Sequence, residues 1–109
     1  MLIKFNELKE ETIKNFHGGA KEVKCNSYTD SYNRIMYSKI LPQASNGKHQ
    51  HTDSSEIMFV ISGHGYAITD GVKEFLTPGV CDYCPKGSTH EVVNDGDVDL
   101  ICYNVICKQ

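Results

Sequence analysis

The sequence lacks any surplus of positive charge. Its 109 residues include 14 acidic and 11 basic side chains, which gives a formal net charge of -3 at pH 7, and Arg34 is the only arginine. Proteins that bind polyanions usually carry a basic patch or stripe. We therefore expect no nucleic acid among the partners of this protein.

Long apolar runs are also missing. No stretch of the sequence approaches the roughly 18 consecutive apolar residues that mark a membrane helix. The opening residues Met1 to Phe5 are too short to form the apolar region of a signal peptide. We therefore expect a cytoplasmic protein without membrane contact. Residues 21–109 contain no internal repeat or low-complexity tract, so we expect no second domain.

The five cysteines do not suggest a disulfide framework. Their number is odd and no secretory segment precedes them, so reduced thiols are expected. Cys81 and Cys84, together with Cys102 and Cys107, would offer four thiolates to a zinc ion. However, residues three or five apart on a strand point to opposite faces, so four sulfurs would not converge. We interpret these cysteines as buried, reduced, small apolar side chains, of which one or two could line a cavity.

Short runs rich in Val, Ile, Tyr and Thr alternate with Gly and Pro, a pattern typical of an all-β domain. Asp70-Gly71 is the strongest hairpin signal, and Ser45-Asn46-Gly47 is expected to form a turn. Eight or nine short strands would hide their edges in a barrel or sandwich. The expected strands are 22–28, 33–41, 48–51, 56–61, 66–69, 72–76, 80–84, 90–93 and 98–107.

Residues 1–22 differ from the rest of the chain. Their apolar side chains are irregularly spaced and end at Gly18-Gly19, which predicts an N-terminal arm with at most a short helical turn around residues 7–14. Residues 23–109 are then the barrel domain. The strands at 56–61 and 98–107 are apolar on both faces, so we expect a second covered surface outside the barrel, such as a dimer contact.

Three histidines and one glutamate form the strongest functional pattern. His49 and His51 are two residues apart, and such residues project from the same face of a strand. Glu56 follows a short turn, and His90 opens a later strand, so an antiparallel barrel could bring both beside the histidine pair. Three imidazoles and one carboxylate suit one divalent ion of iron, manganese, cobalt, nickel or zinc. The sequence therefore predicts a metal site at these four residues.

Two motifs contain these residues: Gly47-x-His49-x-His51-(x)4-Glu56-(x)6-Gly63 and Gly79-(x)5-Pro85-x-Gly87-(x)2-His90-(x)3-Asn94. They resemble the two motifs of the cupin superfamily. The resemblance implies a small, single-domain, metal-binding cupin: a double-stranded β-helix, or jelly roll, that often forms a homodimer. It also implies the same four ligands. Gln43 and Val80 stand where the family usually has a glycine and an acidic residue, which affects the turns and not the ligands.

Several other residues allow more than one interpretation. His17 and His64, each beside a glycine, are interpreted as exposed turn residues without function. Arg34 could face inward and pair with an anionic substrate, or it could be a solvated charge at a strand edge. The cavity lining is expected to come from among Tyr37, Met58, Phe59, Tyr66, Tyr83 and Tyr103, although packing in the core would equally explain any of them.

Four protein ligands on an octahedral ion leave two open positions and a net charge near +1, which favours a small anion. The leading hypothesis is a metal-dependent enzyme of the isomerase, lyase or decarboxylase type that acts on a sugar acid or dicarboxylate, with the ion as Lewis acid. The alternatives are an iron-dependent dioxygenase and a binding protein without catalysis. No general base is evident, since Asp82 and Glu74 are candidates only because they are acidic. The motifs fix neither the substrate nor the native metal.

Overall fold

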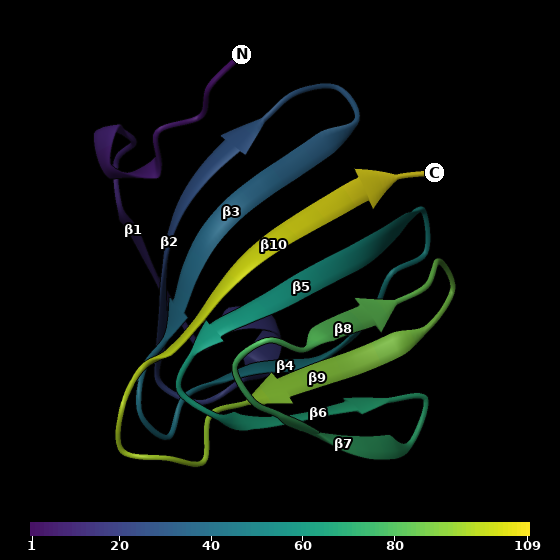
Figure 1. The fold of residues 1–109 in the computed structure, drawn as a ribbon. Coiled ribbons are helices and arrows are strands. Elements are labelled where there is room, and N and C mark those ends of the chain that lie inside the picture. Colours follow the sequence, from purple (N-terminus) through teal and green to yellow (C-terminus); the bar gives the residue numbers. More distant parts are fainter.

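A computed structural model describes all 109 residues, and its ten strands form two sheets. Figure 1 shows the two sheets facing each other. The six-stranded sheet has the order β1-β2-β3-β10-β5-β8, and the four-stranded sheet has the order β4-β9-β6-β7. This arrangement confirms the predicted all-β jelly roll. The strands are β1 (Glu11–Lys14), β2 (Glu22–Thr29), β3 (Asn33–Ile40), β4 (Ser45–Gln50), β5 (Ser54–Ser62), β6 (Gly65–Thr69), β7 (Val72–Leu76), β8 (Cys81–Cys84), β9 (Thr89–Val93) and β10 (Leu100–Lys108).

The helical content is limited to two short 3₁₀ helices in the N-terminal segment, η1 (Phe5–Glu7) and η2 (Phe16–Gly18). None of the helices has the length and apolar character that a membrane crossing requires. The expected helical turn around residues 7–14 is wrong in part, because Glu11–Lys14 is a strand. This strand pairs with β2, with Ile13 opposite Val23. Its backbone N–H and C=O groups therefore form hydrogen bonds within the sheet and not within a helix.

The segment Ser45–Gly47, which we expected to be a turn, belongs to strand β4. A shift of register between Asn46 and His49 marks a bulge where β4 pairs with β9. A Cβ atom at Gly47 would collide with the carbonyl oxygen of His17. The glycine is therefore needed for a close approach of two backbones, which a sequence pattern does not distinguish from a turn.

Side chains from both sheets fill the core between them. Ile40, Met58, Val60, Leu100 and Cys102 lie on the inner face of the six-stranded sheet and are at most 2% exposed. They belong to one apolar cluster that Ala67, Leu76 and Val92 complete from other strands. Alternation along the strands therefore buries every second side chain, as the pattern predicted.

The outer face of the six-stranded sheet is apolar as well. The strand register places Tyr37, Tyr103 and Phe59 in one row across β3, β10 and β5. Phe59, Ile61, Tyr83 and Tyr103 are between 40% and 54% exposed in the single chain. The strands expected to be apolar on both faces therefore do present an apolar outer face, which is partly exposed in the single chain.

The cysteines do not converge on a common point. Cys84 and Cys102 are buried, whereas Cys81 is exposed and Cys107 is half-buried. Burial, reinforced by nearby carboxylates, raises the pKa of Cys84 to about 11 and that of Cys102 to about 12. The structure therefore contains no four-thiolate zinc site, and the two buried thiols stay protonated at neutral pH.

We predict that Leu100→Ala lowers the free energy of unfolding by about 2–5 kcal/mol, because it removes a fully buried side chain and leaves a cavity. Urea unfolding followed by circular dichroism measures the change. Val72→Ala is the control, since Val72 is 60% exposed, and its effect should stay within about 0.5 kcal/mol. Equal effects of the two substitutions would contradict this description of the core.

We also predict that no more than two of the five thiols react with a maleimide between pH 7 and pH 9 in the folded protein. The reagent attacks the thiolate, and Cys25, Cys84 and Cys102 are all buried. Burial raises the pKa of each of these three thiols, to about 11 for Cys84 and about 12 for Cys102, so they stay protonated in this pH range. Mass spectrometry counts the labels, and all five thiols should react after unfolding in urea. Rapid labelling of Cys102 in the native protein would refute its burial.

Candidate metal centre

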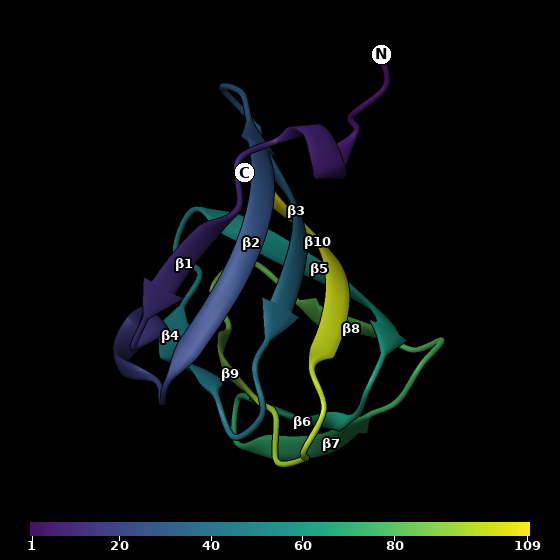
Figure 2. The same ribbon diagram turned by 90° about the vertical axis from the view of Figure 1, so that its left-hand side faces the viewer.

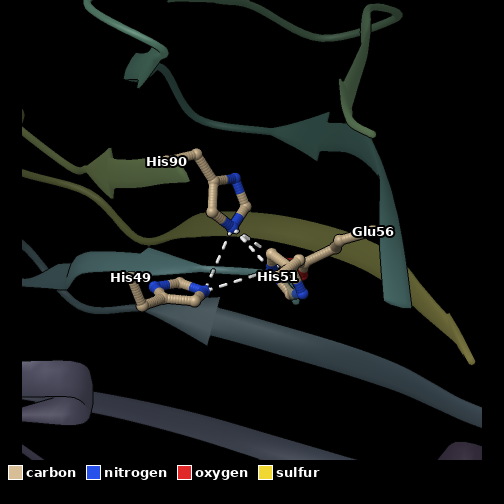
Figure 3. A group of neighbouring side chains, drawn as sticks. All are labelled: His49, His51, Glu56 and His90. Atoms are coloured by element: carbon tan, nitrogen blue, oxygen red, sulfur yellow. Dashed lines mark hydrogen bonds and ion pairs between the residues drawn. The ribbon is translucent and has the colours of Figure 1, made fainter. Parts of the chain in front are cut away.

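The structure brings together all four side chains that the motifs single out. His49 lies on β4, His51 follows the end of that strand, Glu56 lies on β5 and His90 lies on β9. Antiparallel pairing of β4 with β9 sets His49 directly opposite His90. Figure 3 shows the three imidazole rings and the carboxylate pointing toward one another.

The ligand atoms are close to one another. The three Nε2 atoms are 3.0 to 3.2 Å apart, and Oε1 of Glu56 lies 3.2 Å from Nε2 of His51 and 3.1 Å from Nε2 of His90. The sixth pair, His49 with Glu56, is longer than an ion-pair contact, although all four atoms lie within 4.8 Å of one another. Five pairs are therefore short and one is long.

This pattern matches an octahedron better than a tetrahedron. With bonds of about 2.1 Å, adjacent ligands of an octahedron lie about 3.0 Å apart and opposite ligands about 4.2 Å, whereas all pairs in a tetrahedron lie about 3.4 Å apart. A divalent ion held by this set would have His49 and Glu56 on opposite sides, with His51 and His90 beside each other. It would keep two neighbouring positions for a further ligand.

Neighbouring groups fix which nitrogen of two rings faces the centre. In the tautomer that leaves Nε2 unprotonated, Nδ1–H of His49 donates to the carbonyl oxygen of Gly47 at 2.7 Å, and Nδ1–H of His51 donates to Oγ of Ser54 at 3.0 Å. Such outer hydrogen bonds are typical of metal-ligating histidines. They hold both Nε2 lone pairs toward the same point.

Glu56 is held by a chain of buried polar groups. Asn104 donates from Nδ2 to Oε2 of Glu56 at 3.0 Å, and the hydroxyl of Ser38 donates to Oδ1 of Asn104 at 2.7 Å. All three side chains are buried. Because Oε2 is occupied by Asn104, the carboxylate presents Oε1 alone to the histidines.

Asp82 lies behind His90. Its Oδ2 is 3.9 Å from Nδ1 of His90, and both atoms are buried without a hydrogen-bond partner. Two orphaned, complementary atoms that face each other are unusual in a folded protein. A small movement of His90 would create the carboxylate–histidine contact that commonly supports a metal ligand.

The electrostatics suit a cation at this point. Burial lowers the pKa of His49 to about 4, so this imidazole is neutral at neutral pH. Burial disfavours the charged form of Glu56, but hydrogen bonds from His51, His90 and Asn104 outweigh it and hold the pKa of this carboxyl well below its usual value. Burial also opposes charge on His90, yet the carboxylates of Asp82 and Glu56 raise its pKa to about 9. Facing Nε2 lone pairs repel each other unless a proton or a metal ion lies between them, so these residues fit a divalent ion.

A small cavity of about 30 Å³ adjoins the cluster. His49 and Glu56 line it, whereas His51 and His90 do not. The cavity therefore reaches the cluster beside His49 and Glu56. Its other lining residues are Phe16, His17, Val23, Cys25, Met36, Ser38, Asn46, Asn104 and Ile106.

The expected aromatic lining is wrong. Tyr37, Phe59, Tyr83 and Tyr103 belong to the outer apolar face, because they alternate with the inward residues of β3, β5, β8 and β10. Met58 is part of the buried core. Tyr66 lies under the ammonium group of Lys73, 4.1 Å from the ring centre.

The other charged candidates also lie outside the cavity. Arg34 lines a separate shallow cleft together with Asp30 and Asp53. Glu74 is exposed on β7, and Asp82 lies behind His90. The cavity therefore contains no carboxylate other than Glu56 and no lysine or arginine.

His17 is exposed, as expected, but it is not isolated from the site. Its ring stacks on His49 with centroids 3.8 Å apart and an interplanar angle of 13°. Sequence reasoning missed this contact, because the arm carries no periodic signal that would place it over β4. Asn104 could have been predicted as a site residue from the sequence, since it is a polar residue at an inward position of an otherwise apolar strand. His64 lies beside Gly96 and outside the cluster.

Known proteins resemble this chain in sequence and in structure. The chain is similar to the oxalate-binding protein of Thermotoga maritima, with 27% identity over 106 residues that cover 92% of this chain and 88% of that protein. It is also similar to the crystal structure of a predicted oxalate decarboxylase from Thermotoga maritima, with a TM-score of 0.93, 25% identity and coverage of 100% of each chain. An RmlC-like cupin from Shewanella frigidimarina shares the fold, with a TM-score of 0.80, 18% identity and coverage of 95% of this chain and 86% of that one.

The family described as "Cupin domain" matches residues 36–106, a span that begins on β3, ends on β10 and contains all four clustered residues. This match covers more than half of the 109 residues. The chain therefore belongs to the cupin family.

Proposed function

We propose that His49, His51, Glu56 and His90 hold one divalent transition metal ion, and that this ion binds a small dicarboxylate. The observation that carries the proposal is the near-octahedral arrangement of four ligand atoms beside a cavity on the open side. Two adjacent open coordination positions on the ion would suit one chelating anion, because such an anion can place one oxygen in each position. A divalent ion with the single carboxylate of Glu56 has a net charge near +1, which favours an anionic ligand.

The size of the cavity narrows the ligand class. The cavity beside the cluster is small, about 30 Å³. A two-carbon dicarboxylate fits this space better than a sugar acid. The Thermotoga maritima relative is named an oxalate-binding protein, which supports the same class.

When bound, the metal ion would supply Lewis acidity, which stabilises negative charge on the ligand. The chain's own residues would orient the ligands and exclude water. Gly47 and Ser54 set the histidine tautomers, and Asn104 leaves one oxygen of Glu56 free. Val23, Met36 and Ile106 make part of the cavity wall apolar, so electrostatic interactions inside it are stronger than in water.

Binding is the function that the geometry supports best. Redox-neutral decarboxylation is the second candidate, supported by the name of the similar structure from Thermotoga maritima and by the apolar wall. The cavity offers no carboxylate other than Glu56 as a general acid or base. An assay for carbon dioxide release from oxalate, run together with oxygen consumption, separates binding, decarboxylation and oxygen-dependent chemistry.

We further propose that the outer apolar face mediates a homodimer. Phe5 of η1 packs on Tyr37 and Tyr103, and Phe59, Ile61 and Tyr83 stay about half exposed. Several large exposed apolar side chains on one face favour an interaction surface. A two-fold interface is self-complementary, so the same rows of aromatic side chains would pack against their copies.

We predict that protein purified without a histidine tag takes up one manganese or cobalt ion per chain, measured by inductively coupled plasma mass spectrometry after gel filtration. His90→Ala should lower metal affinity by at least about 100-fold, since it removes a ligand and breaks contacts to Glu56. His64→Ala is the matched control, because His64 lies outside the cluster. A chain that binds no transition metal would refute the metal proposal.

We predict that Phe59→Lys shifts the protein to a monomer in analytical ultracentrifugation, because it places a charge in the centre of the outer apolar face. Val72→Lys, on the exposed strand β7, should leave the oligomeric state unchanged. A wild-type protein that sediments as a monomer at all concentrations would contradict the dimer proposal.

A further inference from the structure

The N-terminal arm is docked onto the strand that carries His49. Ser45 donates its N–H to the carbonyl oxygen of Ala20 at 3.0 Å, and Ala20 donates its N–H to Oγ of Ser45 at 2.8 Å. Figure 2 shows β1 alongside β2 and the turn that follows β1 next to β4. The arm is thus held at a defined place by backbone contacts.

Two glycines allow the backbones to come this close. A Cβ atom at Gly19 would collide with the carbonyl oxygen of Ser45 and approach the nitrogen of Gly47, and a Cβ at Gly47 would collide with the carbonyl of His17. Gly19 has a φ of -74°, an ordinary value for any residue, so its constraint is steric alone. The pair of glycines therefore sets how deeply the arm reaches toward the cavity.

The docked arm presents His17 at the cavity. The ring of His17 stacks between Phe16, at 4.2 Å, and the ligand His49, at 3.8 Å. His17 has a φ of 51° and a ψ of 34°, a left-handed conformation that non-glycine residues seldom adopt. A side chain held in this way beside a ligand is part of the site, although the family motifs do not include it.

Asn46 lies on the same wall. Its Oδ1 is buried and has no hydrogen-bond partner, and its side chain lines the cavity next to His49. A buried amide without a partner costs stability unless a ligand satisfies it. The amide can be turned so that its NH₂ group donates to a carboxylate oxygen.

We propose that His17 and Asn46 form the ligand-selecting wall of the cavity: His17 limits its length, and Asn46 hydrogen-bonds the carboxylate that faces it. The inference rests on the proposed function and adds the residues that restrict the ligand to a two-carbon dicarboxylate. With the arm in place, a longer dicarboxylate would meet the ring of His17. Neither residue is a metal ligand, so both act on the bound anion and not on the ion.

The test compares oxalate with malonate on manganese-loaded protein by isothermal titration calorimetry. Metal content is measured after each titration, so that removal of the ion by the dicarboxylate is detected. Asn46→Ala should weaken oxalate binding by about 10-fold or more, as expected for the loss of a hydrogen bond to a charged group. Its metal affinity should remain within about 2-fold of the wild type, because no ligand contact is lost.

His17→Ala should raise the ratio of malonate affinity to oxalate affinity by about 5-fold or more. The reason is that removal of the imidazole ring makes the cavity longer. Gly19→Ala should raise this ratio in the same direction, because the added methyl group forces the arm away from β4. His64→Ala is the control for a general effect of removing an imidazole, and it should leave the ratio unchanged.

The outcomes separate the two proposals. If metal-loaded wild type binds neither dicarboxylate, the proposed function fails. If wild type binds oxalate and the His17 and Asn46 variants keep both affinity and selectivity, the inference about the wall is overturned and the proposed function stands. Loss of metal from His17→Ala would also overturn the inference, since it would show that the residue supports the ion.

Discussion

The antiparallel pairing of β4 with β9 places His49 opposite His90, and the other features of the site depend on this register. The two strands come from the two separate sequence motifs, and the two histidines are 41 residues apart in the sequence. A slip of one residue would turn the side chains of one strand to the other face and remove one histidine from the cluster. The bulge between Asn46 and His49 lies beside this pairing, where a local change of twist can aim a side chain.

Four polar side chains within a few ångströms of one another are unfavourable inside a protein unless each has a partner. Here Gly47, Ser54 and Asn104 form hydrogen bonds with the outer atoms of three of them, which are Nδ1 of His49, Nδ1 of His51 and Oε2 of Glu56. Their inner atoms, Nε2 of the histidines and Oε1 of the glutamate, remain directed at one point. The only outer atom without a partner is Nδ1 of His90, which faces Asp82. The arrangement is what a cation-binding site needs: fixed lone pairs, one negative charge and little room for adjustment.

Local patterns in the sequence predicted the fold class, and the resemblance to the two cupin motifs predicted which residues cluster. Alternating apolar residues and turn signals indicated the strands, and the spacing of His49 and His51 indicated a shared face. Sequence reasoning failed where the structure depends on contacts between distant segments. Gly47 looked like part of a turn, but it serves a close approach of the arm. His17 looked like an unattached turn residue, but it stacks on His49.

The aromatic residues show a further limit of sequence reasoning. Tyr37, Phe59 and Tyr103 were expected to line a cavity, and they form a row on the opposite face of the same sheet. Alternation assigns residues to one of two faces, but it does not say which face is the interior when both are apolar. The buried partners Asn104 and Ser38 would have been better indicators, since polar residues on inward positions need a specific reason to be there.

Under the proposed function, an ion held by His49, His51, Glu56 and His90 would be six-coordinate, with two neighbouring positions open toward the cavity. Visible absorption of the cobalt-loaded protein tests it directly, because six-coordinate cobalt absorbs weakly and four-coordinate cobalt absorbs strongly. We predict a weak spectrum that shifts on addition of oxalate without loss of the metal. An intense spectrum that oxalate does not change would show a closed tetrahedral site and contradict the account.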